Sequence, residues 1–466
     1  MYFLFRKPMS LHLNIHFLGG SGTVTGSKFL LELPGKKILI DCGIFQGIKE
    51  LRELNWQHLP LKAADIDLVL LTHGHADHIG FLPRLVNMGF KGPVWGTAPT
   101  LDIAEIIMHD SAKIQEEDAE RSNKDGFTKH KPAKPLYNLL DVEKTLPLLQ
   151  PKPEGEWITI DDQINIRFQY SGHIIGATFI ELEISGKRIV FSGDVGRSAD
   201  PLLYDPKKPE RADVLVMEST YGDRLHSENS VSEKLLSIIE ETVQKNGTLI
   251  IPSFAVERAQ LLMFLIWQLY QEGKLPGSLP VILDSPMGID AYSVFRKHDK
   301  WHKLDAETCM EISRWVHMVQ SYRETWEIIE NPEPKIIIAG SGMVTGGRVL
   351  SYLKVYLKKQ ETTVLLAGYQ AEGTRGRDLL DGAEEIGLFG KMHPVKARIE
   401  MLEGLSGHAD QEELAGWVSG LKNRPQAVYL VHGEQAARSA LKTRLYDTFG
   451  WDIKIPALFE IEELEL

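Results

Sequence analysis

The sequence predicts an α/β protein built from two domains, because two kinds of pattern occupy different parts of the chain. With 466 residues it is longer than one ordinary hydrophobic core needs, which favours two domains or one domain with a large insertion. Up to about residue 200, apolar and polar residues alternate over short stretches, as they do in half-buried strands. After about residue 220, apolar strands alternate with helical stretches, which is typical of a mostly parallel sheet with helical crossovers.

The first part is predicted to consist mainly of short strands separated by turn residues. Each strand is a stretch in which apolar side chains alternate with polar ones or form a continuous run. The predicted strands cover residues 11–17, 28–33, 37–41, 66–72, 164–170, 178–184 and 188–194. The last two flank a Ser-Gly-Lys turn and predict a hairpin. A helix over residues 101–121 and a polar loop over 124–135 interrupt this series.

The second part is predicted to alternate between buried strands and helices. The predicted strands cover residues 248–253, 281–285, 335–340 and 363–368, and the clearest helices cover 256–272 and 348–358. From residue 398 the chain is predicted to form a strand, a helix over 411–421, a strand over 427–432 and a final helix.

Composition argues against several classes of protein. No stretch is apolar over the length that a transmembrane helix requires, so no membrane partner is expected. Residues 1–10 lack the apolar centre and the cleavage site of a signal peptide. Cys42 and Cys309 are too few for a disulfide framework, which favours a reducing, cytoplasmic location. A net charge of −12 argues against a nucleic-acid partner unless a basic surface is local.

A histidine cluster carries the clearest chemical signal. Residues 73–78 read His-Gly-His-Ala-Asp-His and directly follow the predicted strand 66–72. Alternating positions on an extended loop can converge on metal, with His73 and His75 at one ion and Asp77 and His78 at a second. Imidazole and carboxylate ligands suit zinc and leave manganese or iron open. A solvated loop is the alternative, and it is disfavoured because three of only 16 histidines cluster beside one aspartate.

This cluster resembles the hallmark motif of the metallo-β-lactamase superfamily. The resemblance implies an αββα sandwich and further metal ligands that each follow a strand, and the matching positions are His173, Asp194 and His432. His73, His75 and His173 would hold one zinc ion, and Asp77, His78 and His432 the other, with Asp194 bridging the two. Asp41 matches the first motif of the superfamily and would orient a ligand rather than bind metal.

The region after Glu218 resembles one branch of that superfamily, the β-CASP nucleases. Residues 218–222 (Glu-Ser-Thr-Tyr-Gly), residues 406–410 (Ser-Gly-His-Ala-Asp) and His432 look like motifs A, B and C of that group. The group includes the endonuclease of the eukaryotic cleavage and polyadenylation factor and bacterial RNase J. Further matching landmarks cover residues 252–260, 284–287, 341–343 and 368–374, so the resemblance extends over nearly the whole chain.

The resemblance implies a domain order and a reaction. The metallo-β-lactamase domain would comprise residues 1–220 and 398–466, with a β-CASP domain of mostly parallel sheet inserted as residues 221–397. The chain would be a zinc-dependent ribonuclease that leaves 5′-phosphate and 3′-hydroxyl ends, acting as an endonuclease, a 5′-to-3′ exonuclease or both. Asp77, Glu218 and His408 would be catalytic, with His408 as the proton donor and Glu218 keeping it cationic.

The phosphates of RNA would need a local basic surface on a chain of net negative charge. The window 335–377 holds seven Lys and Arg residues against two acids. Residues 341–348 follow a predicted strand and open a helix, and their glycines let backbone N–H groups approach a phosphate. The predicted contacts are Ser253, Arg258, Ser341, Gly342, Gly346, Gly347, Arg348, Arg375 and Arg377. The alternative is an ordinary strand–helix turn beside a solvated helix face.

Three other functions stay open from the sequence. The metal motif alone also fits a hydrolase of small esters or thioesters, although a long insertion is unnecessary for such substrates. A non-catalytic RNA-binding scaffold would be expected to have lost metal ligands, and a DNA nuclease would usually lack His432. Single-stranded RNA is therefore the expected partner. The resemblance is to short prokaryotic members without KH-like domains, which leaves a homodimer undecided.

Overall fold

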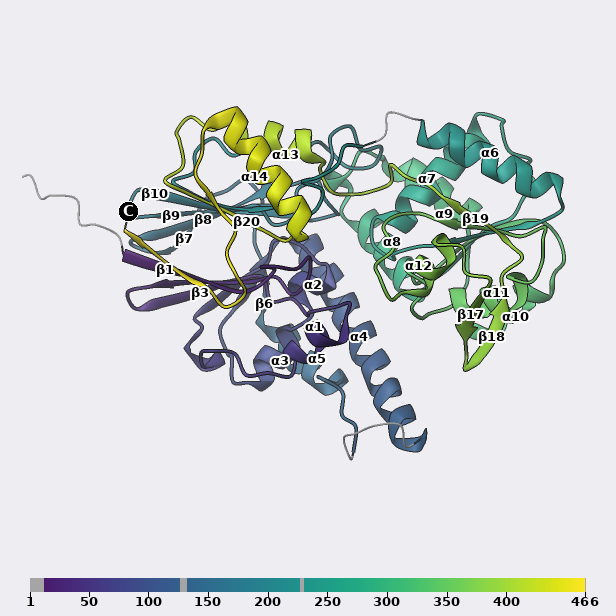
Figure 1. Ribbon diagram of the computed structural model, residues 1–466, viewed down its shortest axis with the longest axis horizontal. Coiled ribbons are helices and arrows are strands. Elements are labelled where there is room, and N and C mark those ends of the chain that lie inside the picture. Colours follow the sequence, from purple (N-terminus) through teal and green to yellow (C-terminus); the bar gives the residue numbers. More distant parts are fainter. Residues whose placement is uncertain (1–11, 126–131, 227–229, 466) are drawn as a thin grey trace, which may run out of the picture. The chain divides into compact units, whose positions relative to one another are not determined.

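The computed structural model describes residues 12–125, 132–226 and 230–465, and these form two compact units (Figure 1). One unit takes the chain up to Ser198, the segment Asp205–Leu225 and the chain from His408 onward. The other unit takes Ala199–Tyr204 and His226–Gly407. The N-terminal segment 1–10 and the middle of the predicted loop 124–135 lie outside the described residues.

The first unit contains two sheets of seven described strands each. The first sheet has the order β22 (Ile461–Glu465), β1 (His12–Gly19), β2 (Lys28–Leu33), β3 (Lys36–Ile40), β4 (Leu68–Leu70), β5 (Val94–Gly96) and β6 (Leu149–Pro151). The second sheet has the order β21 (Ile453–Lys454), β20 (Ala427–Val431), β11 (Val214–Glu218), β10 (Lys187–Phe191), β9 (Thr178–Ile184), β8 (Ile164–Tyr170) and β7 (Ile158–Asp161). Strands β9 and β10 form the predicted antiparallel hairpin.

The two sheets pack face to face because each strand buries every second side chain. In β1 the buried set includes Ile15 and Phe17, and in β8 it includes Ile166 and Phe168. The ring centroids of Phe17 and Tyr429, which come from different sheets, are 5.2 Å apart. Burying an apolar side chain of this size contributes roughly 1.5–3 kcal/mol, so this shared core is what joins the sheets.

Helices cover both outer faces and complete the αββα sandwich. On the side of the first sheet lie α1 (Lys49–Leu54), α2 (Ala76–Ile79), α3 (Leu82–Asn87), α4 (Ala98–Asp125) and α5 (Leu139–Thr145), with short 3-10 turns at Ala63–Asp65 and Leu146–Leu148 (Figure 1). On the second sheet lie α13 (Gln411–Val418) and α14 (Gln435–Phe449), whose Leu414 and Leu441 pack on Leu215 of β11. The predicted fold class is confirmed. None of the helices in the described ranges is both long and apolar enough to span a bilayer.

The second unit is a parallel sheet with helical crossovers, as predicted. Every recorded strand pair of its main sheet is parallel. The order is β14 (His317–Met318), β13 (Val281–Asp284), β15 (Lys335–Ala339), β12 (Thr248–Pro252), β16 (Thr363–Leu366) and β19 (Arg398–Met401). Its helices are α6 (Val231–Gln244), α7 (Arg258–Gln271), α8 (Pro286–Lys297), α9 (Ala306–Trp315), α10 (Tyr322–Glu330), α11 (Val349–Tyr356) and α12 (Arg375–Leu380), with a 3-10 turn at Asp299–Trp301.

Two features of this unit lie beyond the sequence prediction. Strands β17 (Glu385–Leu388) and β18 (Lys391–Pro394) form a separate antiparallel hairpin. The sequence places residues from 398 onward in the sandwich domain, whereas β19 pairs with β16 and this unit continues to Gly407. Strand pairing explains the difference, because only the partner strand reveals to which sheet a short apolar run belongs.

Candidate metal centre

The predicted metal ligands of the first unit gather where strands of both sheets end. Strands β8, β10, β11 and β20 run in the same direction, so their carboxyl ends lie at one edge of the second sheet. The polar residues at or just after these strand ends, and after β3 and β4 of the first sheet, are Asp41, His73, His173, Asp194, Glu218 and His432.

Three histidines surround one oxygen of Asp194. His73 Nε2 lies 3.5 Å from Asp194 Oδ2, and His173 Nε2 lies 3.4 Å from the same atom. His75 Nδ1 lies 3.2 Å from both of these ring nitrogens. The four ligand atoms all lie within 4.8 Å of one another, so one ion could contact all four.

A second group faces the other oxygen of Asp194. His78 Nε2 and His432 Nδ1 each lie 3.5 Å from Asp194 Oδ1. The Nε2 atoms of the two histidines are 3.2 Å apart, and Asp77 Oδ2 lies 3.4 Å from His432 Nε2. The atoms of Asp77, His78 and His432 also lie within 4.8 Å of one another. Asp194 therefore faces one group of potential ligands with each carboxylate oxygen.

The electrostatics of this cluster fit a cation. Asp194 is buried, and its Oδ1 has no hydrogen-bond donor among the described residues. Burial raises the pKa of this carboxyl above its ordinary value, and it lowers the pKa of His75 to about 4. Burial also opposes a charge on His78, but Asp194 and Asp41 raise the pKa of His78 to about 10. Buried carboxylates thus demand positive charge here, and a divalent metal ion bound by neutral imidazoles would supply it.

Asp41 contacts residues of the candidate centre but is in neither group of potential metal ligands. Its carboxylate accepts hydrogen bonds from the backbone N–H of Thr72 and from the Thr72 hydroxyl, both at 2.8 Å. Its Oδ2 also lies 2.7 Å from His78 Nδ1, which leaves Nε2 of that ring directed at the centre. The Thr72 hydroxyl in turn lies 3.1 Å from His73 Nδ1. One carboxylate therefore orients a ligand from each group.

His408 and Glu218 form a pair beside the metal ligands. His408 Nδ1 lies 3.3 Å from Glu218 Oε1 and 4.0 Å from Asp194 Oδ2. The Glu218 carboxylate is fully buried and accepts backbone N–H groups from Val195 and Thr220, at 2.7 and 3.1 Å. Burial opposes the imidazolium, but Glu218 raises the pKa of His408. The pair therefore suits a proton donor, although its atoms and Asp194 could also hold an ion.

Sequence reasoning missed two residues that position this site. The Thr220 hydroxyl lies 3.0 Å from His432 Nδ1. The Ser192 hydroxyl accepts the backbone N–H of Glu218 at 2.9 Å. Both residues stand inside or next to motifs already identified from the sequence. The position of Thr220, two residues after Glu218, could therefore have predicted that it lies at the site.

The predicted phosphate contacts all belong to the second unit, whereas the predicted metal ligands all belong to the first unit. Ser341, Gly346 and Gly347 share one loop after β15. The Ser341 hydroxyl accepts the backbone N–H groups of Thr345 and Gly346 at 3.1 and 3.2 Å. Gly342 belongs to the same loop and stands so close to Phe254 that a Cβ would lie 2.7 Å from its ring. The loop is therefore ordered by its own hydrogen bonds.

The arginines predicted as phosphate contacts all have protein partners in the structure. Arg348 Nη1 lies 3.2 Å from Asp284 Oδ1, and Asp284 is fully buried. The other contacts are Arg375 Nε to the Gly387 carbonyl at 2.6 Å, Arg377 Nε to Asp381 at 2.8 Å, Arg258 to the Ala367 carbonyl, and the Ser253 hydroxyl to the Phe254 carbonyl at 3.0 Å. A phosphate at these arginines would have to share or replace such partners.

Comparison with known families assigns the parts of the chain. Residues 22–243 match the metallo-β-lactamase superfamily, and residues 259–379 match the β-CASP domain. Residues 392–456 match a domain described as a Zn-dependent metallo-hydrolase RNA specificity domain. A solved structure from Enterococcus faecalis V583, described as a protein of unknown function, shares the fold with a TM-score of 0.54 at 12% identity. That alignment covers 97% of this chain and 100% of the other.

Individual relatives cover nearly the whole chain. Ribonuclease TTHA0252 of Thermus thermophilus is 33% identical over 432 residues, which is 91% of this chain and 94% of the relative. Transcription termination factor FttA of Methanosarcina mazei is 30% identical over 470 residues, which is 96% of this chain and 71% of the relative. The resemblance stated from the motifs is thus confirmed. The chain belongs to the β-CASP ribonuclease family of the metallo-β-lactamase superfamily and is a metal-dependent hydrolase, and the histidine cluster around Asp194 is its candidate metal site.

Proposed function

We propose that this protein hydrolyses phosphodiester bonds of single-stranded RNA with two zinc ions and leaves 5′-phosphate and 3′-hydroxyl ends. The observation that carries the proposal is that each carboxylate oxygen of Asp194 faces a different group of potential ligands. A bridging carboxylate between two ligand groups is the arrangement that two-metal hydrolases require. The His408–Glu218 pair beside it supplies the proton chemistry that cleavage needs.

The ligand roles follow the two groups of side chains. One ion would contact His73, His75 and His173, the other would contact Asp77, His78 and His432, and Asp194 would contact both. Bound zinc would activate water and polarise a phosphate oxygen, and manganese is the alternative ion for the same ligands. Asp77 would also be catalytic, since it is the ligand carboxylate with the more exposed side chain, at 20% against 2% for Asp194.

His408 would protonate the leaving oxygen. When water attacks phosphorus, the bond from phosphorus to the 3′ oxygen breaks, and that oxygen must receive a proton to leave as a hydroxyl. Glu218 engages Nδ1 of His408, so the proton would come from Nε2. Because Glu218 raises the pKa of this ring, His408 holds a proton at neutral pH more readily than an ordinary histidine.

Two comparisons support RNA as the substrate. One relative is named a ribonuclease, and part of this chain matches a domain described by RNA specificity. In the second unit, the glycine-rich loop with Ser341, Gly346 and Gly347 would offer a phosphate its backbone N–H groups other than those of Thr345 and Gly346, which the Ser341 hydroxyl already accepts. Arg348, Arg375 and Arg377 would add positive charge near that loop.

The experiment that tests the function is cleavage of one RNA oligonucleotide, labelled at each end in turn. It is supplied with a 5′-hydroxyl, with a 5′-monophosphate and as a circle, alongside the Asp194→Ala variant. Cutting of the circle by the parent chain alone would establish endonuclease activity. Release of mononucleotides only from the 5′-monophosphate form would establish 5′-to-3′ exonuclease activity.

Controls separate the alternative substrates. A DNA oligonucleotide of matched sequence tests the DNA nuclease, and a panel of lactones and thioesters tests the small-substrate hydrolase. If no nucleic acid is cut by protein that contains two zinc ions per chain, the proposal is wrong and the small-substrate hydrolase takes its place.

The variant His408→Ala tests the assignment of its role. We expect it to retain both zinc ions and to lose about 10²–10⁴-fold in kcat, which is the usual contribution of a general acid. Zinc content is measured by atomic absorption and kcat by RNA cleavage. A variant that loses one zinc ion would instead make His408 a ligand, which its position within 4.8 Å of Asp194 and Glu218 atoms permits.

A further inference from the structure

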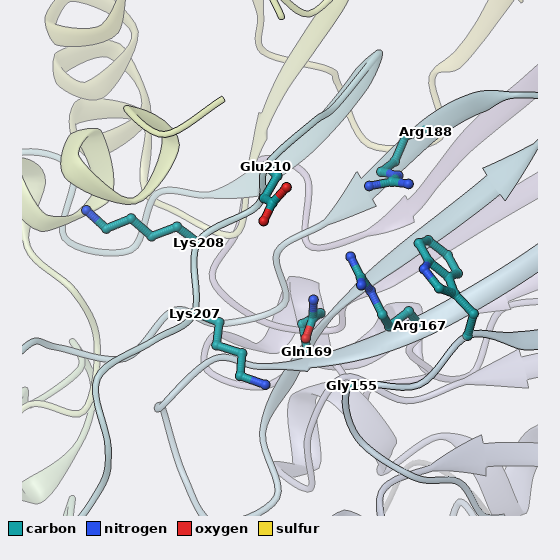
Figure 2. A pocket seen from close by; sticks show the side chains of 8 residues that line it. Gly155, Arg167, Gln169, Arg188, Lys207, Lys208 and Glu210 are labelled. Carbon is teal, nitrogen blue, oxygen red and sulfur yellow. The ribbon is translucent and has the colours of Figure 1, made fainter. Parts of the chain in front are cut away.

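A basic cavity lies on the outer face of the second sheet of the sandwich, and none of the predicted metal ligands lines it. Its volume is about 580 Å³, and Figure 2 shows the residues that line it. Four of them are cationic, namely Arg167, Arg188, Lys207 and Lys208, and one is acidic, namely Glu210. The remaining lining residues are Gly155, Trp157 and Gln169. Such a concentration of cations is unexpected in a chain of net charge −12.

The two arginines are held in place by carboxylates and by a tryptophan ring. Arg167 lies on β8 between the core residues Ile166 and Phe168, so it points to the outer face. Its Nη2 lies 2.6 Å from Glu181 Oε2, and Arg188 Nη2 lies 2.5 Å from Glu183 Oε2. Both guanidinium groups also lie over the ring of Trp157, at 4.5 and 4.9 Å from its centroid. Fixed guanidinium groups lose little entropy when they bind an anion.

One donor of this cluster lacks a partner. Arg188 Nε is buried and contacts no hydrogen-bond acceptor among the described residues. The Arg188 side chain as a whole is only 15% exposed, so little solvent reaches it. Leaving a buried cationic N–H without an acceptor is unfavourable, because the group has lost its water without gaining a partner. An anion in the cavity would offer acceptors at this place.

The opposite wall is a loop fixed to the same sheet. The backbone N–H of Lys207 donates to the Tyr170 carbonyl at 3.0 Å, and Trp417 Nε1 donates to the Lys207 carbonyl at 2.7 Å. In Figure 2 this loop runs beside the arginine-bearing strands. Lys207 Nζ lies 2.6 Å from Glu154, whereas Lys208 has no acidic partner within 4 Å in the described part of the chain.

The nearby acids do not cancel this charge. Glu181 contacts both arginines, Glu183 contacts Arg188, Glu154 contacts Lys207, and Glu210 contacts Lys422 at 2.7 Å. Counting these partners, five cationic side chains meet four carboxylates at the cavity. Because Lys208 and Arg188 Nε keep unused donors, the cavity favours a small multivalent anion with several acceptor oxygens.

We propose that this cavity is a phosphate-binding site separate from the metal centre. A phosphate group offers several strong acceptors to guanidinium and ammonium donors, and the exposed part of Trp157 could carry an attached base. The phosphate would come from the backbone of an RNA strand or from a free nucleotide. Only the RNA source rests on the proposed function. His173 of the candidate metal centre follows Arg167 by six positions, which limits their Cα atoms to roughly 20 Å apart, a span that one short strand can cover.

The test removes two exposed charges from the loop and changes no residue of the sheet. The variant Lys207→Gln/Lys208→Gln is compared with Lys49→Gln/Lys144→Gln, which removes two exposed lysines from α1 and α5 of the same unit. Both pairs are introduced into the zinc-loaded His408→Ala chain, so that RNA stays intact if the chain is a nuclease. Binding of a fluorescein-labelled single-stranded RNA is measured by anisotropy at several salt concentrations, and binding of adenosine 5′-diphosphate by calorimetry.

We expect the Lys207/Lys208 variant to bind RNA more weakly and to lower the slope of log affinity against log salt by about 1.4, since each contact with single-stranded phosphate contributes about 0.7. The control pair leaves that slope unchanged. A loss confined to adenosine 5′-diphosphate would support the phosphate site and assign it to free nucleotide. If both lysine pairs behave alike with both ligands, the proposal is overturned. A changed slope for RNA that the parent chain never cleaves would uphold the site and reject the proposed nuclease.

Discussion

Three histidines of the candidate metal centre, His73, His78 and His432, have a polar partner at Nδ1. His73 and His78 have Nδ1 next to the Thr72 hydroxyl and the Asp41 carboxylate, at 3.1 and 2.7 Å. His432 has Nδ1 next to a threonine hydroxyl at 3.0 Å. The partner of one nitrogen fixes the orientation of the ring and selects the nitrogen that can bind metal. At the residue scale, the supporting polar residues therefore orient the rings of the predicted ligands.

Replacing Asp41 tests this support. We expect Asp41→Asn to bind zinc about 10–100-fold more weakly, because the neutral amide no longer holds His78 and Thr72 as the carboxylate does. Zinc affinity is measured by competition with a coloured chelator. The matched control is Asp452→Asn, which removes an exposed carboxylate from the same unit. Equal zinc affinity in the two variants would contradict a supporting role for Asp41.

Replacing Glu218 tests the proton donor through its pH dependence. A general acid works only while protonated, so activity falls as pH rises through the pKa of His408. Glu218 raises that pKa against the effect of burial. We therefore expect Glu218→Gln to move the alkaline limb of the kcat profile to lower pH. The profile is measured by RNA cleavage, with the exposed Glu50→Gln as control. An alkaline limb at the same pH in all three proteins would rule out this coupling.

At the scale of elements, the loops that carry the ligands touch backbone to backbone. A Cβ on Gly196 would lie 2.0 Å from the carbonyl oxygen of Gly172, next to His173. A Cβ on Gly43 would lie 1.6 Å from the carbonyl oxygen of Asp77. Real Cβ atoms do not approach other atoms so closely, so these positions admit glycine alone. The loops are thereby held close enough for their ligands to meet.

Adding one methyl group at such a contact should disturb the fold. We expect Gly196→Ala to lower the free energy of unfolding by about 2 kcal/mol, which corresponds to about 4–8 °C in Tm. The control is Gly416→Ala in α13, where a Cβ meets nothing within 4 Å and alanine favours the helix by up to about 1 kcal/mol. The Tm of both variants and of the parent chain is measured by scanning calorimetry. A Tm for Gly196→Ala at or above that of the parent chain would contradict the predicted clash.

In the second unit, the sequence pattern predicts a helix or a loop but not the distant residue that a side chain contacts. The composition of residues 341–348 predicts the glycine-rich loop after β15, but it does not predict which residue pairs with Arg348. That partner, Asp284, lies 64 residues earlier at the end of β13, and its carboxylate also accepts hydrogen bonds from Thr325 and Tyr352. The charge of a sequence window includes only the residues within it. It therefore leaves out acids such as Asp284, which the fold places beside a basic residue of the window.

At the scale of the whole molecule, the two units should respond differently to metal removal. The carboxylates and histidines of the centre all belong to the sandwich unit. Zinc bound at these residues would stabilise that unit alone, by about 2.7 kcal/mol when zinc is present at 100 times its dissociation constant. We expect a chelator to lower the Tm of one calorimetric transition and to leave the other in place. The same chelator already saturated with zinc serves as control, and identical scans would contradict a metal site in the folded chain.

The sequence by itself determined the fold class, the strands with clear alternation and the residue types that gather in the candidate metal centre. Strand β2 has the bounds that its pattern predicts, because six residues with a buried face leave a readable signal. The three-residue strands β5 and β6 were missed, since so short a run shows no period. The histidines of residues 73–78 were found because they are adjacent in the chain.

Only the tertiary structure decided which distant groups meet. It placed Glu218 beside His408, 190 residues later, and turned the two oxygens of Asp194 toward different groups of ligands. It also gathered Arg167, Arg188 and the lysine loop around one cavity, although no motif joins them in the sequence. The physical reason is that pairing and packing bring strands together by shape and burial, which one-dimensional spacing does not record.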